Sequence, residues 1–553
     1  MYQHPGVYIE HVPSNQLSIE QASTAVTAFI GFIPRGIRIT DDKTKSEPTF
    51  ITNVTQYARA FGPLGGGSGG ILDNNQTADA FGHAINLYFA NGGTKAYVLP
   101  VANTDGGKAK SAALDTPDLK VEFEATSGGI WANDLIIRVD KVDDEYAITL
   151  GTKVQTLKAD GTKEDKEEVV VGSNGLSGAA KKTKDKTVKV LNVLETFAGL
   201  SPVTTRPNYI EAQMNGASLL VTAKRTGAGT VANPADDFFP VDVPINSTAG
   251  TAATAPKDSD FQLALDRLKD YRDVSTIVLP SLSWPDDKTT YQRAITHAEF
   301  MKNRMVLVDP KNPEKNADQL KTPADVKTAG FTTSPYTALY YPYLKVPNPF
   351  YDPDTNAGVP ETFAIAPSAM AAGMWARIDR SRGVWKAPAG LEATVRGALG
   401  SNVLIGNELQ DNLNSSGVNC LRSIIGPMVV WGGRTLATKA KPQYRYIPVR
   451  RTQNMIGESL YNALQAVVFE PNDHKLWGGL RASIGNFMDG LHRAGAFQGE
   501  KASDAYFVNC GLGSTMTQGD IDAGIVRVVV GFAPLKPAEF VVVQIQQIVG
   551  QTA

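Results

Sequence analysis

Cysteine is almost absent from this chain of 553 residues, since only Cys420 and Cys510 occur. Two isolated thiols cannot build a disulfide framework, and they lack the close spacing that zinc sites use. Their scarcity predicts buried free thiols in a protein assembled in a reducing compartment. The six histidines are also dispersed, with none at the helical spacing of a zinc pair. We therefore expect no metal site.

An excess of charge of one sign is also missing. The chain carries 54 Lys and Arg against 56 Asp and Glu, so no net field draws it toward nucleic acid or an anionic membrane. No apolar run reaches the roughly 18 residues of a membrane-spanning helix, and the N-terminus does not read as a signal peptide. These absences disfavour a nucleic-acid-binding protein and a membrane-inserted one.

The sequence also lacks recognisable catalytic motifs. Residues Gly65–Gly70 fit the dinucleotide loop, and within them Gly66–Gly70 fit the serine-hydrolase elbow. Both motifs require a preceding strand, whereas a helix pattern precedes this tract, so it supports neither. No Walker phosphate loop and no legible Ser-His-Asp arrangement occurs. We expect no cofactor, no catalytic residue and no enzymatic activity.

The chain does contain strand and helix patterns in alternation, with a β-rich interruption. Residues 26–102 and 259–426 alternate apolar strands with amphipathic helices, which predicts one α/β domain in two parts. Residues 103–258 carry short β-branched segments between polar turns, which predicts an inserted antiparallel β domain. Within the second α/β part, the proline- and tyrosine-rich segment 319–362 predicts ordered but irregular structure.

Both ends of the chain predict extended arms. Residues 1–25 include the short strand pattern of PGVYIEHVPS, bounded by prolines. Residues 427–538 form a C-terminal region in which HKLWGGLRASIGNFMDGLHRAG carries an apolar stripe at helical spacing. Residues 539–553 are rich in valine and isoleucine on both faces of a strand, so we expect this strand to be covered on both faces.

Several stretches together resemble the contractile tail sheath proteins of myovirus-type bacteriophages. The resemblance spans both ends and the α/β middle, and the block Tyr446–Ile545 is specific by itself. Its remaining signals are PGVYIEHVPS, TAFIGFIPRG, GGIWANDLIIRV and APSAMAAGMWARIDRSRGVWKAPAG. The same pattern is found in R-type tailocins and related contractile injection systems, so a tailocin sheath remains an alternative. A subtilisin-fold hydrolase is a second alternative, which rests on fold analogy alone.

The resemblance implies an α/β and α+β multidomain architecture. A subtilisin-like α/β middle domain would carry the inserted antiparallel β domain, and an α+β inner domain would face the tail tube. The implied function is structural: stacked hexameric rings form a sheath that contracts from a metastable extended state and drives the tube through the host cell envelope. Implied partners are other copies of the chain, the tail tube protein, and the baseplate and tail terminator proteins. The implied location is the virion tail, assembled in the host bacterial cytoplasm.

The resemblance also implies site residues in the two arms, which would complete sheets of neighbouring subunits. For the N-terminal arm these are Val7, Tyr8, Ile9 and Val12. For the C-terminal arm they are Phe540, Val541, Val542, Val543, Ile545, Ile548 and Val549. Four basic residues are candidates for tube contact, with a solvated polar helix face as the alternative: Lys475, Arg481, His492 and Arg493.

Overall fold

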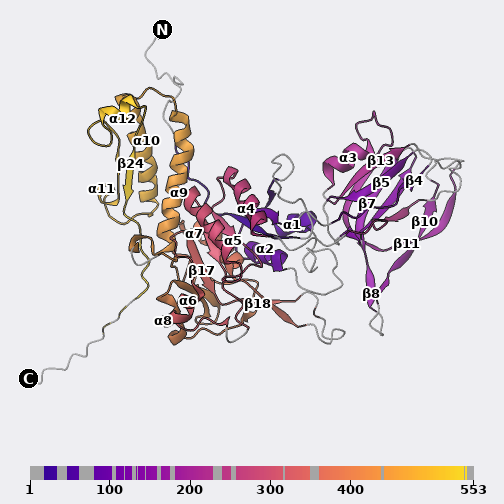
Figure 1. The fold of residues 1–553 in the computed structure, drawn as a ribbon, viewed down its shortest axis with the longest axis horizontal. Helices are drawn as coiled ribbons and strands as arrows, with labels where there is room; N and C mark the ends of the chain where they lie inside the picture. The colour runs from indigo at the N-terminus through magenta and orange to yellow at the C-terminus, as the bar shows by residue number, and fades with distance from the viewer. Residues whose placement is uncertain are drawn as a thin grey trace, which may run out of the picture.

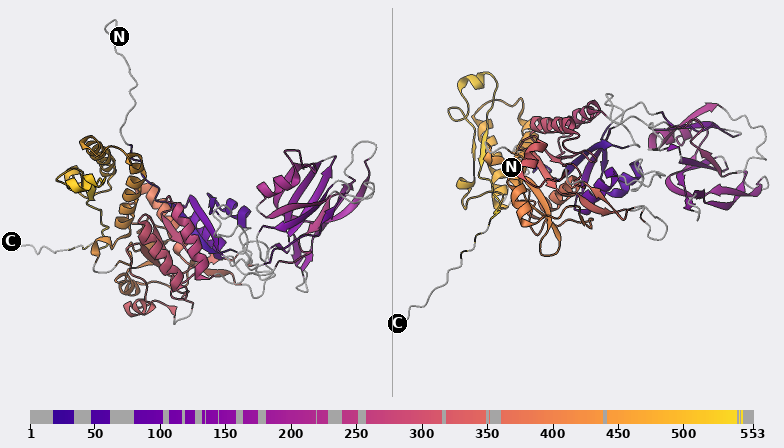
Figure 2. Two further views of the ribbon diagram at one scale, coloured as in Figure 1. Left: turned by 45° about the horizontal axis from the view of Figure 1, so that its top comes forward. Right: turned by 60° about the horizontal axis from the view of Figure 1, so that its bottom comes forward.

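The fold is described from a computed structural model, drawn as a ribbon in Figure 1. The described residues are 18–33, 47–61, 80–101, 107–116, 119–126, 132–133, 135–143, 145–157, 163–174, 181–218, 220–227, 239–250, 257–314, 318–348, 351, 360–437, 441–540, 542 and 544. Figures 1 and 2 show a central α/β region between a β-rich region at one end and the helices α9 and α10 at the other. The expected mixed α/β, multidomain fold is confirmed.

An eight-stranded sheet forms the central region, in the order β2-β3-β1-β15-β16-β17-β21-β22. Its inner strands pair in parallel, and the two edge strands, β2 and β22, pair antiparallel with their neighbours. Strands β16 and β17 are buried along their whole length, as expected for parallel strands covered on both faces. The bounds are β1 Val26–Phe32, β2 Thr49–Ile51, β3 Lys95–Val101, β15 Thr276–Val278, β16 Met305–Val308, β17 Thr337–Tyr341, β21 Val418–Ser423 and β22 Met428–Trp431.

Helices cover both faces of this sheet. One face packs on α1 (Val54–Phe61), α2 (Ala80–Ala90) and α7 (Ser368–Arg382). The other face packs on α4 (Asp258–Arg267), α5 (Lys288–Met301), α6 (Pro323–Ala329) and α8 (Asn407–Asn414). Gly373 lets α7 approach α2 closely, because a Cβ there would lie 2.1 Å from the Tyr88 carbonyl oxygen. The α7 helix is therefore held firmly in the centre of the fold.

Two sequence expectations need correction here. The segment 319–362 is not irregular throughout, because it supplies α6 and the fully buried central strand β17. It also contributes β18 (Leu344–Pro347) to a small sheet with β19 (Thr362–Ile365) and β20 (Gly400–Ser401). Strand β22 lies beyond the expected start of the C-terminal region at 427, yet it pairs with β21 in the central sheet. In both places tertiary burial, rather than the local proline and aromatic content, decides the structure.

Antiparallel strands dominate the region between 107 and 250. They form sheets in the orders β12-β7-β6-β14 and β13-β5-β4, with two hairpins, β10-β11 and β8-β9. One cluster of buried apolar residues lies among them, separate from the clusters of the central sheet. The bounds are β4 Leu114–Asp115, β5 Lys120–Ala125, β6 Leu135–Val142, β7 Glu145–Lys153, β8 Gln155–Leu157, β9 Lys163–Asp165, β10 Glu167–Ser173, β11 Thr183–Lys189, β12 Leu191–Leu200, α3 Ile210–Ala217, β13 Val221–Gly227 and β14 Val241–Pro244.

The C-terminal region is built on two long helices, α9 (Ile447–Leu464) and α10 (His474–Arg493). The apolar stripe expected on α10 is buried at Leu480, Ile484, Met488 and Leu491. The stripe packs with α9 and with a two-stranded sheet, whose strands are β23 and β24. The bounds are α11 Ala502–Ala505, β23 Tyr506–Asn509, α12 Gln518–Asp522 and β24 Val529–Phe532. None of the described helices is long and apolar enough to cross a membrane.

Candidate functional site

The N-terminal arm leaves the fold through residues 18–25, which we name the N-terminal root. Its backbone is fixed to α9, because the Ala22 N–H donates to the Ser459 hydroxyl at 2.8 Å. The Thr24 hydroxyl donates to the Asp379 carboxylate at 2.6 Å. These two contacts join the root to α9 and to the last turns of α7.

A buried ion pair lies directly behind the N-terminal root. The Arg451 guanidinium donates to both Asp379 oxygens, at 2.9 and 2.5 Å, and these side chains are only 4% and 6% exposed. Arg451 also donates to the Thr24 carbonyl at 3.0 Å and lies 4.4 Å from the centre of the Trp375 ring. A forked guanidinium suits this bidentate arrangement. One arginine thus connects α9, α7 and the root of the arm.

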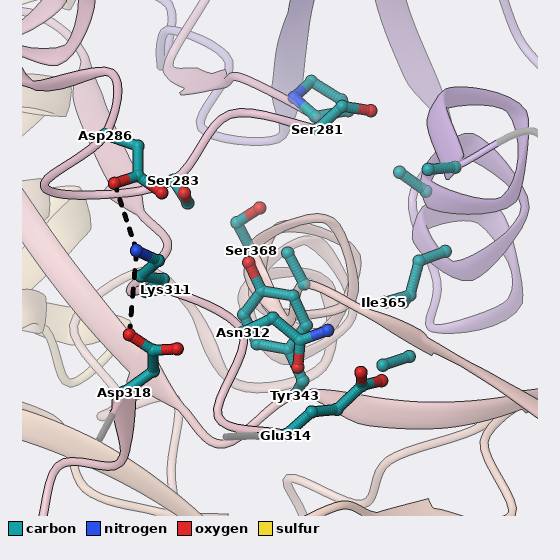
Figure 3. Close-up of a pocket in the computed structure, with 15 residues that line it drawn as sticks. Ser281, Ser283, Asp286, Lys311, Asn312, Glu314, Asp318, Tyr343, Ile365 and Ser368 are labelled. Atoms are coloured by element: carbon teal, nitrogen blue, oxygen red, sulfur yellow. Dashed lines mark ion pairs between the residues drawn. The ribbon is translucent and has the colours of Figure 1, made fainter. Parts of the chain in front are cut away.

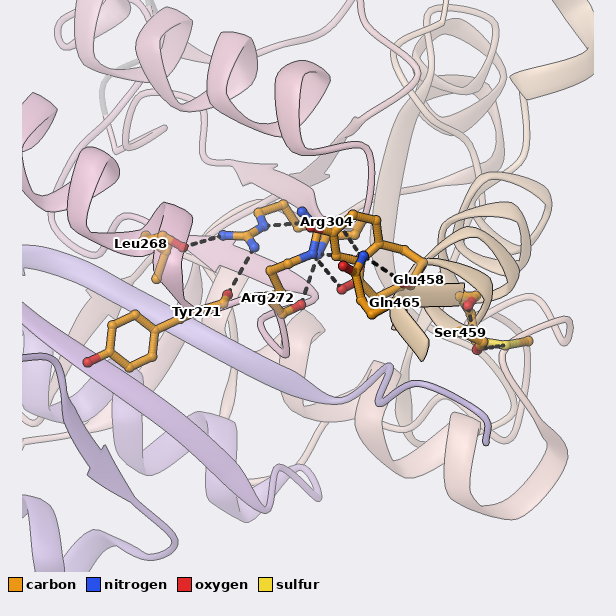
Figure 4. Close-up of polar contacts among 10 residues, drawn as sticks. Leu268, Tyr271, Arg272, Arg304, Glu458, Ser459 and Gln465 are labelled. Carbon is orange, nitrogen blue, oxygen red and sulfur yellow. Dashed lines mark hydrogen bonds and ion pairs between the residues drawn. The ribbon is translucent and has the colours of Figure 1, made fainter. Parts of the chain in front are cut away.

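A second ion pair joins α9 to the loop after α4. Glu458 accepts from Arg272 at 2.9 and 2.6 Å and from the Asn303 amide at 3.1 Å, and Arg272 stacks 3.6 Å from the Tyr461 ring centre. Figure 4 shows Arg272 between Glu458 and the neighbouring Arg304. Burial lowers the pKa of Arg304 to about 10, so this side chain stays charged at neutral pH. The C-terminal helices are therefore fixed to the α/β region at several points.

The C-terminal arm leaves through residues 535–539, the C-terminal root. Glu539 pairs with Arg434, whose Nε donates to Oε1 at 2.8 Å, and the two side chains are 15% and 5% exposed. Arg434 also donates to the Asn414 carbonyl at 2.6 Å, and the Tyr446 hydroxyl donates to Glu539 at 3.4 Å. This root is consequently anchored at the N-terminal end of α9.

The structure places few of the predicted arm residues. Phe540 and Val542 belong to no strand and are 76% and 82% exposed. The remaining predicted arm residues lie outside the described residues: Val7, Tyr8, Ile9, Val12, Val541, Val543, Ile545, Ile548 and Val549. Strand exchange through them stays a prediction.

The sheet of β23 and β24 has open edges. The strands pair antiparallel with each other, and within the described residues neither has a second strand partner. Tyr506, Val508 and Val530 pack on the α10 cluster, whereas Phe507 and Val529 are about half exposed on the other face. Open strand edges readily accept an added strand. This sheet thus has edges that an extended arm could join.

A cavity of about 480 Å³ lies near the carboxyl ends of the central parallel strands (Figure 3). Ser368 lines it, but the Ser368 hydroxyl donates at 2.5 Å to the buried Asp309, which also accepts the Ser368 N–H at 3.1 Å. Lys311 lies between Asp286 and Asp318, at 3.4 and 3.6 Å. In the described part of the chain no group of side chains is arranged to hold a metal ion. The serine is thus bonded to a carboxyl group instead of being paired with a histidine base.

Two family models match this chain. The phage tail sheath protein central domain matches residues 253–436, and the phage tail sheath C-terminal domain matches residues 439–548. Together these matches span more than half of the sequence. The chain belongs to the phage tail sheath family. No curated protein matches it.

Solved sheath structures share the fold of this sheath protein. The contracted sheath of an extracellular contractile injection system, PVC, is 22% identical with a TM-score of 0.52, and the match covers 99% of each chain. The contracted helical sheath of the anti-feeding prophage is 21% identical with a TM-score of 0.54, covering 99% of this chain and 100% of that one. A sheath tail protein from Listeria innocua is 12% identical with a TM-score of 0.55, covering 94% and 96%. At these identities the likeness establishes the fold.

The four candidate tube-contact residues of the sheath protein all lie on α10, but they differ in their surroundings. Arg481 donates to the Cys510 carbonyl, and the His492 ring lies 3.1 Å from the Gly499 carbonyl. Arg493 pairs with Asp489 one turn earlier, at 2.5 Å, while the side chain of Lys475 is exposed. Arg481 and His492 therefore bond backbone carbonyls of their own subunit, whereas Lys475 is exposed and Arg493 stays 79% exposed in its pair with Asp489.

The sequence analysis did not identify the root ion pairs. Arg451, Asp379 and Glu539 stand in stretches that carry the resemblance, and Arg434 lies outside them, but in each pair the partner lies far away in the sequence. A signal was present at Asp379, since it directly follows the buried apolar run that ends at Ile378. A charge in such a position requires a partner, but the sequence does not say which one.

The buried Asp309 makes stability depend on pH. Burial raises its pKa from 3.8 to about 7, although the Ser368 hydrogen bonds oppose the shift. Because the folded state holds the proton more tightly, stability falls as pH rises from about 4 to about 7. Asp309→Asn should therefore stabilise the full chain at pH 8, by about 2 to 4 kcal/mol, and have little effect at pH 4. Thermal unfolding at both pH values measures this difference.

The exposed Asp286→Asn change is the control for Asp309→Asn, and it should not shift the stability at either pH. An equal effect of Asp309→Asn at pH 4 and pH 8 would contradict the assignment of a raised pKa to Asp309.

Proposed function

We propose that this chain forms the contractile sheath of a phage tail. Copies stack as hexameric rings around a tail tube, and contraction from a metastable extended state drives the tube through the host cell envelope for genome delivery. The observation that carries the proposal is that each arm departs from a root held by an ion pair, which is the buried pair Arg451–Asp379 in one root and the largely buried pair Arg434–Glu539 in the other. Such roots would transmit force from an arm to the domain that anchors it.

Strand exchange would link neighbouring copies. The two arms would supply extended strands, and the open edges of the β23–β24 sheet would receive them. Backbone hydrogen bonds provide attachment in this mode, while alternating side chains set the register. Exposed Phe507 and Val529 on that sheet support the assignment, since an added strand brings apolar side chains that can cover them.

Contraction would then be a turning of rigid domains about retained links. Hinge motion places large backbone changes in short connecting segments while packed interiors stay intact. The bonds from α9 to Asp379 and Arg272 favour moving the C-terminal helices together with the central sheet. Such a mechanism releases energy stored in the extended state and requires no nucleotide.

The proposal also assigns a role to each domain. Residues 26–102 and 259–436, which include β22, would form a middle domain of subtilisin-like fold, residues 103–258 an outer β domain, and residues 439–538 the inner domain facing the tube. The middle domain would act as a scaffold, and the bond between Ser368 and Asp309 supports a structural role for this serine. Labelling of the purified protein by a serine-directed fluorophosphonate would contradict this. Beyond the tube, the partners are the baseplate and tail terminator proteins, in a virion tail assembled in the host cytoplasm.

A sheath of a tailocin or another injection machine is the second candidate function. The likeness to the PVC and anti-feeding prophage sheaths supports it, since the first of these is described as an extracellular contractile injection system. Capsid genes beside the coding gene would favour the phage tail, and their absence would favour the injection machine.

Electron microscopy of the expressed full chain tests the shared structural role. Long hollow tubes with helical striation are expected. A purified chain that stays monomeric over a wide range of concentration and salt, with the tail tube protein present, would contradict the proposal.

Reversal of two exposed charges tests the tube contact. Lys475→Glu and Arg493→Glu together should reduce co-sedimentation of the tail tube protein with the sheath at least severalfold, while sheaths still form. Lys327→Glu is the matched control, because it reverses an exposed charge on α6, a helix that packs on the central sheet. Unchanged tube attachment would show that these residues are only a solvated helix face.

A further inference from the structure

The turn between α9 and α10 presents an aromatic side chain in an unusual backbone conformation. Phe469 has a φ of 74°, in the left-handed region that residues other than glycine rarely adopt, and its side chain is fully exposed. Val468 beside it is also exposed. An exposed phenylalanine in a strained backbone conformation destabilises the monomer, because its ring stays in water and its backbone is held in an unfavourable conformation. Such a cost points to a use of the side chain outside the monomer.

The turn is held rigidly on both sides of Phe469. The Glu470 N–H donates to the Val467 carbonyl at 3.2 Å. The Asp473 side chain caps the start of α10 by accepting from two backbone N–H groups, and the Asn472 side chain donates to the Ile525 carbonyl at 3.3 Å. Phe469 and Glu470 therefore form a fixed projection, an aromatic side chain next to a carboxylate, which we name the Phe469 knob.

A groove with matching chemistry lies elsewhere on the same chain. It has a volume of about 860 Å³ and runs between the C-terminal root and the central region. Trp385 and Trp431 supply aromatic surface to it, and Ala389 also lines it. Aromatic and arginine side chains in a concave site are typical of interface anchor positions.

The groove also carries more unpaired positive charge than negative charge. Lys386, Arg422 and Lys536 line it, and none of them forms an ion pair with a described residue. The Arg422 Nη groups bond the Gln410 and Asn407 side chains at 2.8 and 2.7 Å. Its buried Nε has no described partner. Asp411 is the one lining acid that is not already paired among the described residues, so the groove favours an anionic occupant.

The knob and the groove cannot meet within one chain. Phe469 precedes the first residue of α10, whereas Ala494 and Gly495, which line the groove, follow its last residue. A helix of 20 residues spans about 30 Å. Two complementary surfaces separated in this way produce a head-to-tail contact between copies, and such contacts build open helical assemblies.

We propose that the Phe469 knob of one sheath subunit docks in the groove of a second copy, between Trp385 and Trp431, with Glu470 facing the basic lining. The contact rests on the proposed sheath function. It would add a side-chain contact to the links made by the arms, and the gain would offset the strain at Phe469. The second copy is favoured over another protein because both halves of the contact are present on this chain with opposite charge.

Cysteine cross-linking tests the contact in sheaths assembled from the full chain. The two natural cysteines are buried, so the double change Phe469→Cys with Ala389→Cys supplies the accessible thiols. Mild oxidation should give a ladder of dimers, trimers and longer species on non-reducing gels, because each copy carries both halves. Phe469→Cys with Thr296→Cys on α5 is the matched control and should give none. No ladder in intact sheaths, or a cross-link to the tail tube protein instead, would overturn the proposal.

Removal of the Phe469 ring tests the contact independently, through the yield of assembled sheath. Phe469→Ser should lower the yield of sedimentable sheath at least tenfold, whereas Phe300→Ser, which changes another exposed phenylalanine on α5, should leave it unchanged. Equal yields for both variants would overturn the proposal. If the unaltered chain forms no sheath at all, the proposed function fails on its own, so the two failures are distinguishable.

Discussion

Deletion of residues 540–553 is expected to abolish sheath polymerisation and to leave a folded monomer. The cut removes the whole arm beyond its root, including every predicted strand residue from Phe540 to Val549. It keeps Glu539, whose pair with Arg434 anchors the root. Because Phe540 and Val542 are largely exposed in the subunit, their removal should cost the subunit little stability. Electron microscopy and analytical ultracentrifugation measure assembly, and thermal unfolding measures the fold.

Deletion of residues 550–553 alone is the matched control for the arm truncation. It shortens the chain but leaves the apolar strand pattern intact, so sheaths should still form. Sheaths of normal length from the 540–553 deletion would show that the C-terminal arm is dispensable. An unfolded product would show instead that the arm stabilises its own subunit.

Arg451→Ala is expected to destabilise the subunit by about 3 to 5 kcal/mol. This change leaves the Asp379 carboxylate buried without its cation, and removal of one partner of a buried pair typically costs this much. It also removes the donor to the Thr24 carbonyl, which loosens the N-terminal root. Urea unfolding of the monomeric fraction gives the free energy, and limited proteolysis of the N-terminal segment reports the loosened root.

Arg493→Ala is the control for Arg451→Ala, because it breaks an ion pair on the surface of α10. Exposed pairs contribute about 0 to 1 kcal/mol, so its effect should be small. A second variant, Arg451→Leu with Asp379→Leu, should recover part of the loss, because no charge is then left buried without a partner. Equal costs for Arg451→Ala and Arg493→Ala would contradict the structural importance of the buried pair.

Local periodicity was a good guide to most of the elements. The alternation of strand and helix patterns predicted the central α/β region, and the three- and four-residue spacing from Leu476 to Leu491 predicted α10. Such a pattern can be read from neighbouring residues, because an element with one buried face repeats its apolar residues at a fixed spacing. The prediction failed where burial was complete: the tyrosine-rich β17 was mistaken for part of an irregular segment, since a strand buried on both faces shows no alternation.

The sequence by itself determined the family, the elements and the presence of an apolar arm at the C-terminal end. Only the tertiary structure decided which charges hold the two roots. Arg451 and Asp379 are 72 positions apart, and the sequence around either residue does not indicate its partner. It also decided that Phe469 is strained and exposed, and that its complementary groove lies at the far end of α10. The spacing of apolar residues along the chain indicates which face of a helix or strand is buried. Ion pairs and surface shape instead depend on segments that meet only after folding.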